Sequence, residues 1–224
     1  MLVVPCLGAV ASIALLGAPH ASAATLTFRY NDSFGSVTPN GPAPYATSVF
    51  DDGESAGTVV LTMFVAATVG NADVTEMYFN LDPSLDPTSL VFTRLSGTGP
   101  TAASTAILLG VDAFVANGDG MYDIFFDLPS GNPDNSRFND GEDLVYEISG
   151  IPTLTASAFF HLANPSGNFG PFRSVAMFIG TGGSGKDSDF VGAVPEPSSV
   201  VLAGFGLLSL LAFALRRWRR RLAV

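Results

Sequence analysis

Cysteine is almost absent from this chain of 224 residues, since its one cysteine, Cys6, lies in an apolar stretch at the amino terminus. The rest of the chain therefore has no thiol for a disulfide or a nucleophile. Only two histidines occur, His20 and His161, and the one tryptophan is Trp218. Zinc needs three or four nitrogen, sulfur or oxygen ligands, so a zinc site is not expected.

Basic residues are also scarce in the middle of the chain. Residues 24–193 contain five basic and nineteen acidic residues, a net charge of −14, whereas the whole chain carries −10. Such a body repels nucleic acid, which we exclude as a partner, and it favours solubility and divalent cations. The other basic residues are gathered at the carboxyl end and form a separate feature.

The first 23 residues have the pattern of a secretory signal peptide. An apolar run from Leu7 to Leu16 is followed by the small-residue triplet Ala21-Ser22-Ala23, although no Lys or Arg precedes the run. This pattern predicts a signal helix over 1–23 that is cut after Ala23. The Sec translocon and signal peptidase are then expected partners, and the body of the protein is exported.

The carboxyl end has the pattern of a membrane span. Residues 198–215 carry no charge and would extend about 27 Å as a helix, enough for the hydrocarbon core of a bilayer. Arginines at the end of a span stay on the cytoplasmic side, so the body is predicted to lie outside the inner membrane. The arginines that stop the span, within 216–221, are Arg216, Arg217, Arg219, Arg220 and Arg221.

A short motif precedes this span, and its residues are Val194, Pro195, Glu196 and Pro197. The motif, the apolar helix and the arginine cluster together resemble the PEP-CTERM sorting signal, in its variant with a leading valine. Such tails are also labelled an ice-binding-protein C-terminal domain, a name that is not evidence of ice binding. The resemblance implies processing by an exosortase, a transient stay in the inner membrane, and delivery to the cell surface or matrix of a Gram-negative bacterium.

Alternation of apolar and polar residues recurs through the body, between clusters of Gly, Pro, Asn and Asp. No stretch has the period of a long amphipathic helix. This pattern predicts about eight strands. They are expected within 25–30, 57–69, 73–81, 89–95, 121–128, 143–149, 153–163 and 174–180.

These strands predict an all-β fold, an antiparallel β-sandwich that is jelly-roll-like or immunoglobulin-like. Its domain is expected to span 24–180, and the eighteen phenylalanines of the chain supply its core. A Gly/Ser-rich linker is predicted over 181–193, before the sorting tail of residues 194–224.

Calcium is the one ion for which the sequence offers candidate ligands. The first loop contains Asn117, Asp119 and Asp123, at the spacing of positions 3, 5 and 9 of a calcium loop, and the second contains Asp140 and Asp143. The loop lacks ligands at its first and last positions. Asn-Gly and Asp-Gly sequences also form hairpin turns, so turn formation is the alternative explanation.

Enzymatic residues are harder to find. His161 is expected to be a residue at a strand end that bonds to a loop, since no G-x-S-x-G motif accompanies it. Asp123 and Asp127 lie on one strand face and could suggest a glycosidase, although a solvated face explains them equally well. We therefore expect a non-enzymatic surface or matrix protein that contacts exopolysaccharide. The alternatives are an exported glycan hydrolase that uses loop carboxylates and a permanently anchored envelope protein.

Overall fold

The computed structural model describes residues 24–35, 37–53, 57–131, 137–181 and 187–195, and they form an antiparallel β-structure with three short 3₁₀ helices. The helices are η1 (Pro87–Ser89), η2 (Ala102–Ser104) and η4 (Ala156–Phe159). The strands are β1 (Thr25–Ser33), β2 (Ala46–Asp51), β3 (Val59–Val65), β4 (Asp73–Phe79), β5 (Val91–Ser96), β6 (Ala106–Ala116), β7 (Gly120–Asp127), β8 (Asp143–Ser149), β9 (Asn164–Pro165), β10 (Ser174–Thr181) and β11 (Asp187–Pro195).

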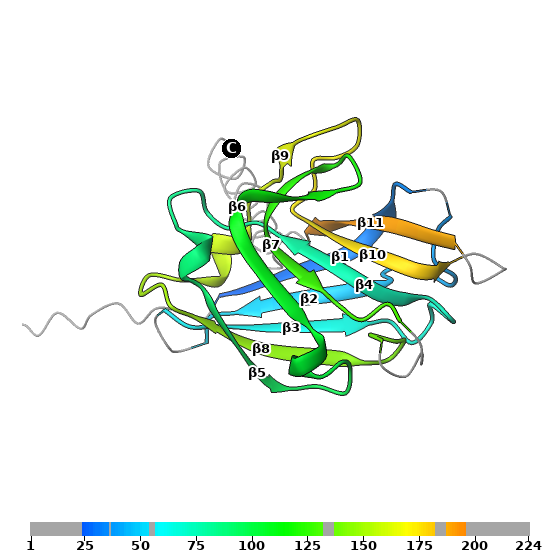
Figure 1. Cartoon of the computed structure of the whole chain (residues 1–224), viewed down its shortest axis with the longest axis horizontal. Coiled ribbons are helices and arrows are strands. Elements are labelled where there is room, and N and C mark those ends of the chain that lie inside the picture. Colours follow the sequence, from blue (N-terminus) through cyan, green and yellow to red (C-terminus); the bar gives the residue numbers. More distant parts are fainter. Residues whose placement is uncertain (1–23, 36, 54–56, 132–136, 182–186, 196–224) are drawn as a thin grey trace, which may run out of the picture.

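All of these strands belong to one hydrogen-bonded sheet. Its order is β5-β8-β3-β2-β1-β11-β10-β4-β7-β6, and β9 pairs with β7. The sheet folds over on itself, so that β4, β7 and β6 lie in front of β1, β2, β3 and β8 (Figure 1). One half of the sheet runs from β5 to β1 in this order, and the other runs from β10 to β6. Aromatic rings of the two halves are in contact: the ring centroids of Phe50 on β2 and Phe79 on β4 are 5.3 Å apart, and those of Phe92 on β5 and Phe126 on β7 are 5.5 Å apart.

This arrangement confirms the predicted all-β, antiparallel class. The expected sandwich of two separately hydrogen-bonded sheets is replaced by a single continuous sheet, because β11 joins β1 of one half to β10 of the other. Phenylalanine supplies much of the core, as expected. Phe50 is fully buried and touches the rings of Phe28, Phe79 and Phe159, so truncating it to alanine would cost about 3–5 kcal/mol.

The strand predicted over 153–163 was wrong. This segment contains η4, and its Phe159 stacks on Phe50 with ring centroids 4.3 Å apart. The prediction placed Phe160 and Leu162 on the same side as Leu154, but Leu154 is buried and the other two are exposed. Alternating alanines matched a strand pattern, whereas the tight turn of a 3₁₀ helix buries Ala156, Ala158 and Phe159 together.

The linker predicted over 181–193 was wrong in its second half, because Asp187 onwards forms β11 in the interior of the sheet. Val191 and Ala193 are buried in the core, and Asp189 is buried as well. Strands β2 and β6 were also missed. The Gly/Ser-rich composition before β11 concealed this strand.

None of the helices in the described ranges is long and apolar enough to cross a membrane. The signal helix predicted over 1–23 and the span predicted over 198–215 both lie outside the described residues. The cleavage residues Ala21 and Ala23 and the five stop arginines lie there too.

Candidate functional site

The sorting signal begins inside the sheet. Val194 and Pro195 are the last two residues of β11, where they pair with Arg29 and Phe28 of β1. Proline lacks an N–H and is tolerated where a strand ends. The other two residues of the signal, Glu196 and Pro197, lie outside the described residues. The folded domain therefore runs directly into the sorting tail without a separate linker.

Asn117 and Gly118 form the tight turn between β6 and β7. Their φ angles are 38° and 76°, the left-handed backbone that Asn-Gly hairpins adopt. At this position the structure supports turn formation, the alternative to calcium binding.

Asp119, the next candidate ligand, is fully buried. Its carboxylate accepts hydrogen bonds from the hydroxyl of Tyr122 and from the backbone N–H of Phe172. Burial raises the pKa of Asp119, and these two hydrogen bonds oppose the increase. Burial and the neighbouring carboxylate raise the pKa of Tyr122 as well. The pair ties β7 to the loop before β10.

Asp123 is held in the same way by backbone donors. Its two oxygens accept hydrogen bonds from the N–H groups of Leu81, at 3.0 Å, and Asp112, at 2.8 Å. Asp112 and Asp123 line a cavity of about 210 Å³ together with Asn80 and His161. Asn80 is buried, and its Nδ2 has no hydrogen-bond partner within the part of the chain that the structure describes. Asn80 gave no signal in the sequence, since only the fold brings it to this cavity.

His161 lies in the loop after η4, not at the end of a strand. Its Nε2 is 3.6 Å from Oδ2 of Asp82, in the loop between β4 and β5. Asp82 also accepts hydrogen bonds from the hydroxyl and N–H of Ser84, which lower the pKa of Asp82. Ser84 thus bonds to the aspartate rather than to the histidine, and the three residues do not form a nucleophilic triad.

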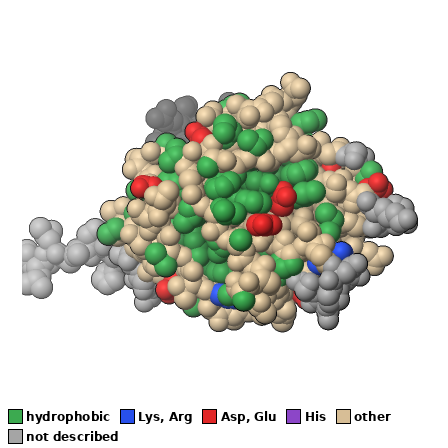
Figure 2. Space-filling view, in the orientation of Figure 1, with side chains coloured by type: hydrophobic (Ala, Val, Ile, Leu, Met, Phe, Trp, Pro, Cys, Tyr) green, Lys and Arg blue, Asp and Glu red, His purple; other side chains and the backbone are tan. Residues whose placement is uncertain are grey.

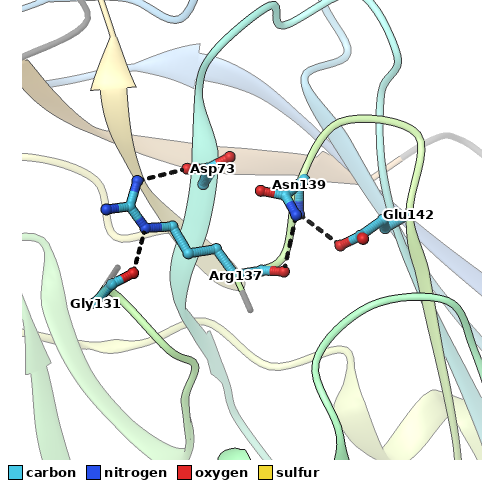
Figure 3. A network of polar contacts seen from close by, with 5 residues as sticks. All are labelled: Asp73, Gly131, Arg137, Asn139 and Glu142. Atoms are coloured by element: carbon cyan, nitrogen blue, oxygen red, sulfur yellow. Dashed lines mark hydrogen bonds and ion pairs between the residues drawn. The ribbon is translucent and has the colours of Figure 1, made fainter. Parts of the chain in front are cut away.

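An ion pair and hydrogen bonds hold the second candidate loop, which contains Asp140 and Asp143, in place (Figure 3). Arg137 pairs with Asp73 at 3.0 Å and donates to the carbonyl of Gly131, while Glu142 accepts a hydrogen bond from the N–H of Asn139. The acids of this network are therefore bound to groups of the chain itself.

Asp140 and Asp143 flank Glu142 but differ in their surroundings. Asp140 is exposed, whereas Asp143 accepts hydrogen bonds from the N–H and hydroxyl of Thr98, which lower its pKa. Across the described residues, no three His, Cys, Asp or Glu side chains gather as a metal site would require. The calcium site stays a prediction from the sequence.

A broad outer surface lies over β4, β7 and β6, and we call it the front face. Figure 2 shows apolar side chains gathered there with acidic side chains among them. Tyr78 stacks on Phe125 at 4.8 Å, and Phe125 pairs with the exposed Leu108. The neighbouring row pairs Glu76 with Asp127, and Glu76 accepts a hydrogen bond from the Tyr78 hydroxyl. The sequence analysis placed Asp127 on a strand face that could be solvated, but it did not predict the stacked rings.

A larger cavity, about 350 Å³, lies between the two free edges of the folded sheet. Its walls come from β5, β6 and β8 and include Phe92, Ile107 and Tyr146. Arg94 also lines it, but its guanidinium is held by the carbonyls of Gly97, Gly99 and Pro100. None of the candidate residues from the sequence reaches this cavity.

The geometry defines a class of protein: an all-β body in which the interior strand β11 contains the first residues of a carboxyl-terminal sorting signal. A family model of the PEP-CTERM protein-sorting motif matches residues 193–221, so the chain carries this motif. The motif implies export across the membrane and an exosortase as the processing partner. No curated protein and no solved structure matches the chain.

Proposed function

We propose that this protein is a non-enzymatic component of the cell surface or extracellular matrix, cut by an exosortase at its tail and in contact with exopolysaccharide there. The matched sorting motif carries the proposal. Exosortase processing would release the body from its transient membrane span at 198–215.

The front face is the surface that suits a polysaccharide. Long polymers need an extended surface, and this one combines the partly exposed ring of Phe125 with the carboxylates of Glu76 and Asp127. Apolar rings pack against the flat faces of sugars, and carboxylates accept hydrogen bonds from hydroxyl groups. The candidate carboxylates Asp119 and Asp123 are buried and already accept hydrogen bonds from the chain, which favours structural roles for them.

Processing is tested by expressing the full chain in a host with an exosortase and in an isogenic strain without it. Fractionation and mass spectrometry of the carboxyl terminus should show a shortened, released form in the first strain only. Replacing Pro195, Glu196 and Pro197 with alanine should leave the full-length chain in the inner membrane. Full-length protein in both strains would instead support a permanently anchored protein.

Polysaccharide contact is tested by co-sedimentation of the processed protein with purified exopolysaccharide. The double variant Glu76→Gln and Asp127→Asn should weaken binding. Asp140→Asn, which changes an exposed acid in the loop before β8, should not. Equal binding by all three proteins would contradict a role for the front face. Cleavage of glycan substrates by the wild type would favour the hydrolase instead.

A further inference from the structure

The distance between the folded domain and the sorting span is very short. Strand β11 ends at Pro195, and the uncharged stretch begins at Ser198, with only Glu196 and Pro197 between them. Three steps along a fully extended chain reach at most about 11 Å. The polar layer on each side of a bilayer is about 5–8 Å thick. The end of β11 must therefore lie at the lipid headgroups whenever the span is in the membrane.

We infer that the uncut protein docks on the outer surface of the bilayer through a patch beside the end of β11. We call it the exit patch, and its residues are Val111, Phe160, Leu162 and Arg173. The inference rests on the proposed membrane span, and it adds which surface of the body meets the lipid.

Phe160 and Arg173 place this patch next to the exit of the chain. Arg173 directly precedes β10, whose Val175 pairs with Gly192 of β11, so Arg173 and Val194 lie at the same end of neighbouring strands. The guanidinium carbon of Arg173 lies 4.0 Å from the centre of the Phe160 ring. Phe160 is nevertheless 42% exposed, and Nε of Arg173 has no hydrogen-bond partner among the described residues.

Two aliphatic side chains extend the patch. Leu162 is 51% exposed and Val111 is 69% exposed, and both line the same 210 Å³ cavity. An aromatic ring, an arginine and exposed aliphatic residues are the side chains that settle at the headgroup layer, where the apolar parts enter lipid and the cation stays hydrated.

The acidity of the body decides how strong this contact is. Asp82 and Asp112 lie near Leu162 and Val111, and they oppose docking on an anionic bilayer. Because the patch has few side chains and acidic neighbours, it should not bind a bilayer stably by itself. The span holds it at the surface, so docking becomes an intramolecular step with a high effective concentration. Cleavage removes the span, and the released body should leave the membrane.

The test uses the full chain with Trp218→Phe, reconstituted in phosphatidylcholine liposomes with and without brominated acyl chains. Tryptophan is then placed at one position at a time, so its fluorescence reports contact with the brominated lipid. Phe160→Trp and Val111→Trp probe the exit patch. Leu108→Trp is the matched control, because Leu108 is 43% exposed but pairs with Phe125 on the front face, whereas Val111 lines the cavity together with Leu162.

We expect all three proteins to float with the liposomes, with bromine quenching at positions 160 and 111 and little at 108. Flotation without quenching at 160 and 111, or with equal quenching at 108, would overturn the docking and leave the span intact. Failure to float would overturn the proposed span and the docking together. Circular dichroism of each variant shows whether the fold is retained.

Discussion

The backbone nitrogen of Ala24 lies 2.6 Å from Oδ1 of Asp52, and Oδ2 of the same carboxylate accepts a hydrogen bond from the N–H of Ala156 at 3.2 Å. Ala24 is the residue that would become the new amino terminus if signal peptidase cuts after Ala23. Cleavage would then turn this nitrogen into an ammonium group already placed beside a carboxylate.

Asp52→Asn should therefore destabilise the mature protein. The change removes an ion pair at a partly exposed site, so we expect the free energy of unfolding to fall by about 0.5–1 kcal/mol. Urea denaturation of the mature protein measures this, and Asp140→Asn serves as the control. An equal stability of wild type and Asp52→Asn would show that the terminus does not engage Asp52.

Substitutions at Asp119 should separate its hydrogen bonds from its charge. Asp119→Ala leaves the N–H of Phe172 without its acceptor and the hydroxyl of Tyr122 with only the distant carbonyl of Phe172, and it should cost about 3 kcal/mol. Asp119→Asn can still bond to both groups and should be much less destabilising. Urea midpoints of the two variants at pH 7 measure the difference.

The pH dependence follows from the raised pKa of Asp119. The folded state holds this proton more tightly than the unfolded state, so stability should fall as pH rises from about 4 through the raised pKa. Asp119→Asn should remove this part of the decline. Parallel stability curves for wild type and Asp119→Asn would contradict the assigned pKa shift.

Gly192 should not tolerate a side chain. A Cβ at this position on β11 would lie 2.4 Å from the ring of Phe172, which packs over the strand. Gly192→Ala should cost about 1–3 kcal/mol, because the ring must move. Gly131→Ala is the matched control, since within the described part of the chain no atom apart from those of its own neighbours lies within 4 Å of its added Cβ. Thermal unfolding of both variants makes the comparison, and equal melting temperatures would contradict the packing.

A spacer between Ala193 and Val194, which leaves the four residues of the sorting motif contiguous, should speed up exosortase processing. Eight Gly/Ser residues add a mean reach of about 16 Å and would lift the sorting signal away from the folded domain. The rate at which full-length chain disappears in a pulse-chase experiment measures this. The same insertion within 182–186 should leave the rate unchanged. Equal rates for both insertions would indicate that the folded domain does not limit access.

Strands with strict alternation were predictable, because successive side chains of a strand point to opposite faces and the apolar positions indicate which face is buried. In β7, Ile124 and Phe126 turn into the core and Asp127 turns outward, as the sequence indicated. The local pattern failed where segments distant in the chain bury a residue or where a turn exposes it. Asp123 looks like a surface residue in the sequence, yet backbone groups of Leu81 and Asp112 cover it. Phe160 looks like a core residue, yet η4 turns it outward.

The sequence alone determined the β class and the address at the carboxyl end, because alternation, turn residues and the sorting motif are properties of short segments. Only the tertiary structure decided that β11 joins the two halves of one sheet and that the sorting signal starts within it. Hydrogen-bond partners such as Phe28 and Pro195 lie far apart in the chain. No local pattern records which distant strand will satisfy their backbone groups, so that choice belongs to the fold.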